Sequence, residues 1–320
     1  MLQHIVIYIL SFVGIWIGSG LIVKAVERIS SSLRTSSFMV SFLLLGFFTS
    51  VSELSVGVNS IIINDPEIYV GNLIGASLVL FMLIIPLLAI FGNSIHITPE
   101  LRGFNLPASL IVVALPVILA IDGEITKLDS YISLAAFTFL MISIQSRKGI
   151  LDKIKDMNSK TTFKFGKEVI KIIIGVAVIF IASRFVVEQT IFFSEYLGVS
   201  PFLVSLLLVA IGTNVPELSI AVRSLFMRNH QVAFGDYVGS AVFNTFLLGV
   251  LTLIYGGSVS LTNSYVVSLL FLIVGLLAFY YFAKTKNTIS RLEAVVLFVI
   301  YILFIVTEIL LHKSLLFWIQ

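Results

Sequence analysis

The sequence contains no cysteine and few charged residues, and both shortages limit what the protein can be. Without cysteine, neither a disulfide nor a thiolate metal site is possible. Only 12% of the residues are charged, about half the share typical of soluble domains, whereas 58% are hydrophobic. The four histidines are scattered, and the apolar segments contain no Ser/His, Asp/Asp or H-E-x-x-H arrangement. This composition disfavours an intramembrane hydrolase and predicts a membrane-embedded protein that is not an enzyme.

Apolar segments recur along the whole chain, each long enough to cross a bilayer, which takes about 20 helical residues. They predict an all-α polytopic membrane protein with ten transmembrane helices. The first segment has no basic region before it and no clear cleavage site, so we interpret it as a retained helix. The expected segments are residues 4–23, 38–63, 69–92, 105–121, 130–146, 169–187, 200–226, 235–254, 263–283 and 292–311.

The basic residues indicate how the chain is oriented. A lysine-rich stretch at 147–168 divides the segments into five and five. When the N-terminus is placed outside the cell, most of the 20 Lys and Arg fall in inner loops, as the positive-inside rule requires. We therefore expect both termini outside and 147–168 to be a cytoplasmic loop. It separates a first five-helix repeat, residues 1–146, from a second, residues 169–320.

The two halves resemble one another when residues 41–81 are compared with 205–245 without a gap. Apolar composition explains matched leucines, but not matched Thr, Glu, Ser and Gly. An odd number of segments per half inserts the second half upside down relative to the first. Such an inverted-topology repeat is typical of secondary transporters, whose ion site lies at the repeat interface. The informative matches are Thr49/Thr213, Glu53/Glu217, Ser55/Ser219, Gly71/Gly235 and Gly75/Gly239.

Two glutamates at corresponding places, Glu53 and Glu217, are the strongest functional signal. A carboxylate inside a bilayer costs several kcal/mol unless it is neutralised, paired or bound to a cation. Pro216 lacks an N–H, so the helix is expected to open before Glu217 and to free backbone carbonyls. Thr213 lies four residues before Glu217 and on the same helix face, and Thr49 stands likewise before Glu53. Such hard oxygen ligands suit Ca²⁺ or Na⁺ rather than zinc or copper.

The segments after these glutamates carry further polar residues. Glycines four apart, as at Gly71 and Gly75, predict close packing against another helix. Ser240 and Asn244 share one helix face and could add oxygens to the site, whereas their counterparts Ala76 and Leu80 cannot. Asn72 and Asp236 are expected as helix N-caps, with a role in ion entry as the alternative, and Glu308 is expected at the membrane interface.

The motif G-T-N-V-P-E-L, followed by G-D-x-V-G-S-x-x-F-N, resembles the second α-repeat of the cation/calcium exchanger superfamily, the sodium/calcium exchangers. T-S-V-S-E followed by G-N-x-x-G resembles the first. The resemblance implies antiport of Ca²⁺ against Na⁺, or against H⁺ in sister groups, with segments one and six as the sliding or gating pair. It implies that Glu53, Glu217, Thr49 and Thr213 bind Ca²⁺. It also implies supporting ligands for monovalent ions at Ser50, Asn214, Gly46, Ala210, Ser240 and Asn244.

Several residues depart from the family pattern. Phe48 stands where the first motif has Gly and Ser52 where it has Pro, while Ala76 and Leu80 replace a hydroxyl and an amide ligand. Asn244 stands where some members have a carboxylate. The Ca²⁺ ligands are thus retained, whereas monovalent ligands from the first half are reduced. We expect fewer Na⁺ per cycle, or a different coupling ion.

The sequence thus predicts a Ca²⁺/Na⁺ antiporter of the cell membrane that works by alternating access. An H⁺/Ca²⁺ exchanger, an uncoupled cation channel and a degenerate, non-transporting paralogue stay open as alternatives. The expected partners are Ca²⁺, Na⁺ or H⁺ and the lipid bilayer. A monomer is expected, with no cofactor and no nucleic acid.

Overall fold

A computed structural model describes residues 1–30, 42, 46–97, 101, 103–145, 165–227, 230–261 and 266–319. Within these residues ten helical spans are long and apolar enough to cross a membrane, as predicted. The predicted basic loop lies outside the described residues as far as 164. The first repeat contains α1 (Leu2–Ser30), α3 (Gly46–Thr49), α4 (Val51–Ile63), α5 (Glu67–Val79), η2 (Leu80–Ile84), α6 (Ile85–Gly92), β1 (Ile95–His96), α7 (Asn105–Leu119), η4 (Ala120–Asp122), β2 (Glu124–Ile125) and α8 (Lys127–Gln145).

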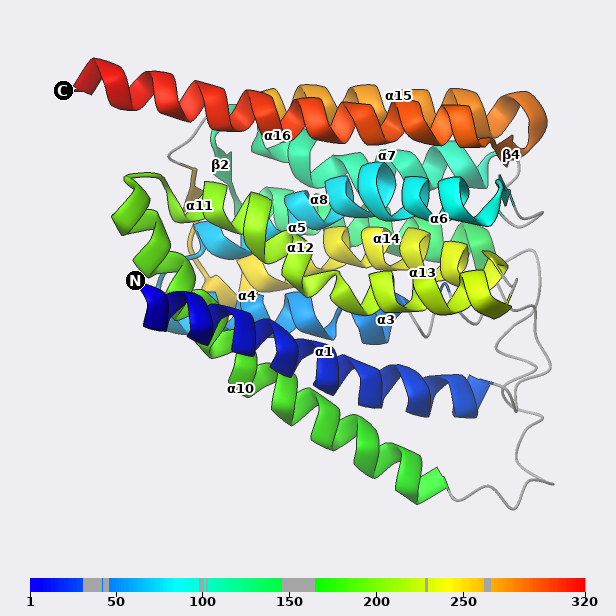
Figure 1. Ribbon diagram of the computed structural model, residues 1–320, viewed down its shortest axis with the longest axis horizontal. Coiled ribbons are helices and arrows are strands. Elements are labelled where there is room, and N and C mark those ends of the chain that lie inside the picture. Colours follow the sequence, from blue (N-terminus) through cyan, green and yellow to red (C-terminus); the bar gives the residue numbers. More distant parts are fainter. Residues whose placement is uncertain are drawn as a thin grey trace.

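The second repeat follows the same order. It contains α10 (Phe165–Leu197), α11 (Pro201–Val204), η5 (Ser205–Val209), α12 (Ala210–Thr213), α13 (Val215–Met227), α14 (His230–Tyr255), β3 (Val259–Ser260), α15 (Val266–Lys286), β4 (Thr288–Ile289) and α16 (Arg291–Ile319). The N-terminus and the end of α16 lie at one end of the bundle, whereas α10 begins at the other (Figure 1). This placement fits the expected topology, in which both termini share one side of the membrane.

Two features make the spans around the bundle centre irregular. Spans two and seven are each interrupted, between α3 and α4 and between α12 and α13. Wide π-helical turns occupy η2 and η5. At η2, Pro86 cannot donate to the carbonyl four residues earlier, which accounts for the widened turn. Such irregular backbone in a membrane is tolerated where it is buried within protein, and it often marks a functional site.

The predicted glycine faces bring helices of opposite repeats into backbone contact. A Cβ on Gly71 or Gly75 of α5 would overlap the carbonyls of Phe202 and Leu206 in α11 and η5. A Cβ on Gly239 of α14 would likewise overlap the carbonyl of Phe42 in the second span. The α5 helix therefore crosses span seven, and α14 crosses span two, at very short range.

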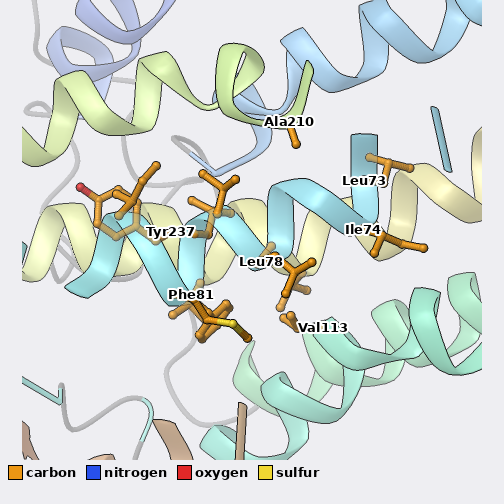
Figure 2. Close-up of a cluster of buried hydrophobic side chains, with 14 of the residues drawn as sticks. Leu73, Ile74, Leu78, Phe81, Val113, Ala210 and Tyr237 are labelled. Carbon is orange, nitrogen blue, oxygen red and sulfur yellow. The ribbon is translucent and has the colours of Figure 1, made fainter. Parts of the chain in front are cut away.

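Apolar packing fixes α5 in the middle of the bundle. Figure 2 shows its buried side chains with Val113 of α7 on one side, Ala210 of α12 on another and Tyr237 of α14 nearby. Every residue of α5 is buried. A helix that is apolar nearly all round belongs in the core of a large bundle, because no face of it needs lipid or water.

Short strands outside the spans join the two repeats. The strand β1 pairs with β4 and β2 pairs with β3, both antiparallel, so each pair takes one strand from each repeat. We call these pairs the two strand clasps. They lie towards opposite ends of the bundle in Figure 1. The clasps tie the α6–α8 region of the first repeat to the α14–α16 region of the second.

The helices α1 and α10 lie against each other at one side of the bundle and slope across it (Figure 1). Gly18 and Gly175 make their contact close, because a Cβ on either would approach the other's carbonyl to 2.8 or 2.7 Å. At one end of the pair Arg28 of α1 binds Glu168 of α10 at 3.0 Å. The pair thus has its own helix–helix interface.

Candidate functional site

Both interrupted spans turn at a single residue. Ser50 (φ −70°, ψ 3°) separates α3 from α4, and Asn214 (φ −87°, ψ 9°) separates α12 from α13. The second break was predicted from Pro216, whose ring leaves the Gly212 carbonyl without its usual N–H donor. The first break was not predicted, because Ser52 stands where proline was expected. The chain therefore opens in both repeats, and both breaks lie at the candidate site.

Hydroxyl groups account for the break without proline. The Ser50 hydroxyl donates to the Gly46 carbonyl at 2.7 Å, and the Ser52 hydroxyl lies 2.8 Å from the Thr49 carbonyl. Hydroxyls that bond back to carbonyls three or four residues earlier bend helices. Asn214 does the same in the second repeat, where its Nδ2 donates to the Ala210 carbonyl at 2.7 Å. The carbonyls of Gly46 and Ala210, which are at equivalent places in the two repeats, therefore each accept a side-chain hydrogen bond from the residue at the break.

The two predicted glutamates lie immediately after the breaks. Glu53 is in the first turn of α4 and Glu217 in the first turn of α13, and both are fully buried. The unpaired N–H groups of a helix's first turn favour negative charge there. Each break therefore supplies a positive helix end to one carboxylate.

Serines bring each glutamate into contact with the other repeat. The Ser52 hydroxyl lies 3.0 Å from Glu53 Oε2 and 3.2 Å from the Thr213 carbonyl. The Ser240 hydroxyl donates to Glu217 Oε1 at 3.1 Å and lies 3.1 Å from the Ser50 hydroxyl. Ser240 therefore lies beside Glu217, where the sequence placed it, whereas the contact of Ser52 with Glu53 was missed.

The two threonines also cross between repeats, in symmetric fashion. Thr49 donates its hydroxyl to Asp236 Oδ1 at 3.2 Å, and Thr213 donates to Asn72 Oδ1 at 3.1 Å. Asn72 and Asp236 are the corresponding residues of α5 and α14. The expectation that they cap helices is wrong, because α5 begins at Glu67 and α14 at His230, one turn or more earlier.

Asp236 is thus a third buried carboxylate near the site, which the sequence analysis did not include. It is fully buried and interacts electrostatically with both Glu217 and Glu53. Its counterpart Asn72 is neutral, so the two repeats carry unequal charge. The signal that could have found it is the exact correspondence of positions 72 and 236 in the repeat.

Several buried polar atoms here have no hydrogen-bond partner. Native proteins leave few such atoms, and inside a membrane each costs several kcal/mol. The amide of Asn244, one turn beyond Ser240, has neither of its polar atoms bonded. Five acceptor oxygens stand unpaired: Glu53 Oε1, Glu217 Oε2, Asp236 Oδ2, Asn214 Oδ1 and Asn244 Oδ1. Unpaired oxygens of this kind fit bound cations.

The site is closed on all sides in this conformation. Its predicted side chains are at most 3% exposed, from Ser50 to Asn244. Phe12 of α1 packs on Gly212 at the second break, where a Cβ would overlap its ring. Among the described residues, no three His, Asp or Glu side chains are arranged to hold a single metal ion. The carboxylates are thus near one another without converging on one point.

One predicted acidic residue lies elsewhere. Glu308 of α16 was expected at the membrane interface, but it is buried against α15, where the Ser268 hydroxyl donates to its Oε1 at 2.9 Å. The local pattern did not reveal this burial, because it depends on the neighbouring helix; the depth of Glu308 in the membrane stays a prediction. Glu308 is not among the residues of the candidate site.

Comparison with known proteins agrees with this architecture. A family model described as "Sodium/calcium exchanger protein" matches residues 3–144 and 167–310. The chain is 25% identical to the sodium/calcium exchanger MaX1 of Methanosarcina acetivorans, covering 95% of this chain and 97% of that protein. It is 24% identical to the inner membrane protein YrbG of Escherichia coli, covering 76% and 79% of the two chains.

A solved structure has the same fold. The sodium–calcium exchanger NCX_Mj, soaked with Na⁺ and Sr²⁺, superposes with a TM-score of 0.68 at 22% identity, covering 95% of this chain and 98% of that one. The ten-helix architecture of two repeats is therefore shared. With the family model matching most of its length, this chain belongs to the sodium/calcium exchanger family of multi-pass membrane transporters.

Proposed function

We propose that this protein is an antiporter that exchanges Ca²⁺ for Na⁺ by alternating access. The observation that carries the proposal is the group of unpaired buried oxygens at the two helix breaks and on the adjoining α14, which includes one oxygen each of Glu53 and Glu217. Carboxylate, hydroxyl and carbonyl oxygens are the ligands of Ca²⁺ and Na⁺. The names of relatives such as MaX1 add support, since they describe exchange of these two ions.

Coupling follows if Ca²⁺ and Na⁺ compete for the same carboxylates. Two buried carboxylates without a cation are costly inside the membrane. The protein therefore switches between its outward-open and inward-open states only when cations are bound. In this scheme Glu53, Glu217, Thr49 and Thr213 bind Ca²⁺. The monovalent ions would use the supporting ligands Ser50, Asn214, Gly46, Ala210, Ser240 and Asn244. The gradient of one ion then drives the other, and no covalent step or cofactor is involved.

The orientation belongs to the same proposal. Both termini would lie outside the cell and the basic loop 147–168 in the cytoplasm, which the distribution of Lys and Arg supports. The pairing of α1 with α10 through glycines supports their proposed role as the moving pair.

The test is ⁴⁵Ca²⁺ uptake into proteoliposomes loaded with Na⁺. The outward Na⁺ gradient should drive accumulation of ⁴⁵Ca²⁺ by the wild type, and Glu53→Gln and Glu217→Gln should each lose this uptake. Glu308→Gln is the matched control, because it removes a buried carboxylate on α16 whose hydrogen bond to Ser268 an amide oxygen can keep. Normal transport by both site variants would overturn the site assignment.

Proton coupling is the second candidate, because Ser52 and Ala76 weaken the first-repeat pattern that Na⁺ exchangers carry. The two functions separate when pH is clamped on both sides of the vesicle and Na⁺ is replaced by N-methyl-D-glucamine. Uptake that persists without Na⁺ and follows an imposed pH gradient would favour H⁺ exchange. Flux that needs neither counter-ion would indicate a channel.

A further inference from the structure

We propose that Asp236 forms a separate position for a monovalent cation, filled together with Ca²⁺ at the Glu53–Glu217 pair. This inference rests on the proposed function. Asp236 Oδ1 accepts a hydrogen bond from Thr49, whereas Oδ2 is buried and has no partner. A carboxylate with one free oxygen in a membrane core calls for a cation.

The α14 face around Asp236 offers further oxygens. Asp236, Ser240 and Asn244 are spaced four residues apart, so they lie on one face of α14. All three side chains are fully buried. The Asn244 amide is an independent sign of a ligand, because both of its polar atoms lack partners. The face therefore presents two unpaired oxygens, Asp236 Oδ2 and Asn244 Oδ1, on either side of Ser240, whose hydroxyl is bonded to Glu217.

Charge balance calls for one positive charge in addition to Ca²⁺. The buried side chains of the described residues include no Lys, Arg or His that could neutralise a carboxylate. Ca²⁺ balances two negative charges, which leaves one of the three carboxylates uncompensated. The three do not converge on a single ion, so the additional cation lies beside Ca²⁺ rather than sharing its position.

The repeat itself provides the matched control. At the corresponding place of the first repeat, Thr213 donates to the neutral Asn72 with nearly the same geometry, 3.1 Å against 3.2 Å for Thr49 and Asp236. The fold thus already accepts a Thr–Asn pair. Asp236→Asn should fold, and the double variant Asp236→Asn/Asn72→Asp moves the charge to the other repeat without changing the charge count.

The first experiment is ⁴⁵Ca²⁺/Ca²⁺ exchange in proteoliposomes. In this assay the transport site moves between the two sides of the membrane only with Ca²⁺ bound. The medium contains N-methyl-D-glucamine, Na⁺ or K⁺ equally on both sides. We expect wild-type exchange to be at least roughly tenfold faster with K⁺ than with N-methyl-D-glucamine, because a single uncompensated carboxylate opposes the change of access. Na⁺ should give the same gain at concentrations too low to displace Ca²⁺ from the two glutamates. Asp236→Asn should exchange equally in all media, and the double variant should regain the dependence. Wild-type exchange without any monovalent dependence would overturn the inference.

A second experiment judges the Asp236 position even if Ca²⁺ transport fails. In detergent without Ca²⁺, Na⁺ or K⁺ should raise the thermal unfolding midpoint of Glu53→Gln/Glu217→Gln, because a bound ion stabilises the folded state. The rise should vanish when Asp236→Asn is added. An equal rise with and without Asp236 would refute the cation position, whereas loss of ⁴⁵Ca²⁺ transport in the wild type would refute only the proposed function.

Discussion

Thr213 of the second repeat donates its hydroxyl to the amide oxygen of Asn72 in the first, at 3.1 Å. Thr49 makes the mirror contact with Asp236 at 3.2 Å. Each broken span is therefore held by the unbroken helix of the opposite repeat. A shift of one repeat against the other would therefore disturb both pairs together.

Loss of the Ser52 hydroxyl should weaken Ca²⁺ binding. Ser52→Ala removes a donor next to Glu53 Oε2, and a hydrogen bond to a charged group is worth about 1.5–3 kcal/mol. We expect the Ca²⁺ dissociation constant, from equilibrium ⁴⁵Ca²⁺ binding, to rise roughly tenfold or more. Ser77→Ala is the control, since that hydroxyl bonds only the Leu73 carbonyl on α5. An unchanged dissociation constant for Ser52→Ala would remove this serine from the site.

A methyl group at the α5 crossing should destabilise the bundle. Gly75→Ala would push a Cβ into the Leu206 carbonyl, and overpacking of this kind costs about 1–3 kcal/mol. We expect a lower thermal unfolding midpoint in detergent. Gly20→Ala on α1, where a Cβ meets nothing within 4 Å, should leave the midpoint unchanged or raise it. Equal midpoints for the two variants would contradict the close crossing.

Lowering the pH should remove a destabilising charge from the loop between α4 and α5. Partial burial, together with the nearby Glu67, raises the pKa of Asp65 from its usual 3.8 to about 6. The pKa of Asp65 is higher in the folded state than in the unfolded state, so ionisation of Asp65 opposes folding. This destabilisation is present at pH 7 and is lost as the pH falls through 6 towards 4. Asp65→Asn should have a higher unfolding midpoint than the wild type at pH 7. The difference should shrink at pH 4, and a constant difference would contradict the raised pKa.

A disulfide between β1 and β4 should leave transport intact. His96 and Thr288 are paired across β1 and β4, where Cα atoms lie within reach of a disulfide. The chain has no cysteine, so His96→Cys/Thr288→Cys introduces the sole pair. We expect ⁴⁵Ca²⁺ uptake to survive oxidation, because both strands lie outside the spans that carry the candidate site. A block that a reducing agent reverses would show that this clasp opens during transport.

Much of the architecture follows from local sequence properties. The ten spans were predicted from segment length, and the break at Asn214 from the missing N–H of Pro216. The break at Ser50 was missed because it depends on which partner the serine hydroxyls take. A hydroxyl can bond its own helix, point outward or bond another helix, and the sequence pattern is the same in each case. Asp236 was misread because Gly235-Asp236 resembles a helix start, whereas α14 begins at His230.

The strand clasps mean that the two halves of the chain are obligate complements rather than a duplicated pair of domains. Each clasp needs one strand from either half, and each threonine finds its acceptor in the opposite half. A single half made alone would present two unpaired strand edges and an incomplete set of ion ligands. Co-expression of the halves as separate chains is therefore the minimum that can rebuild the site.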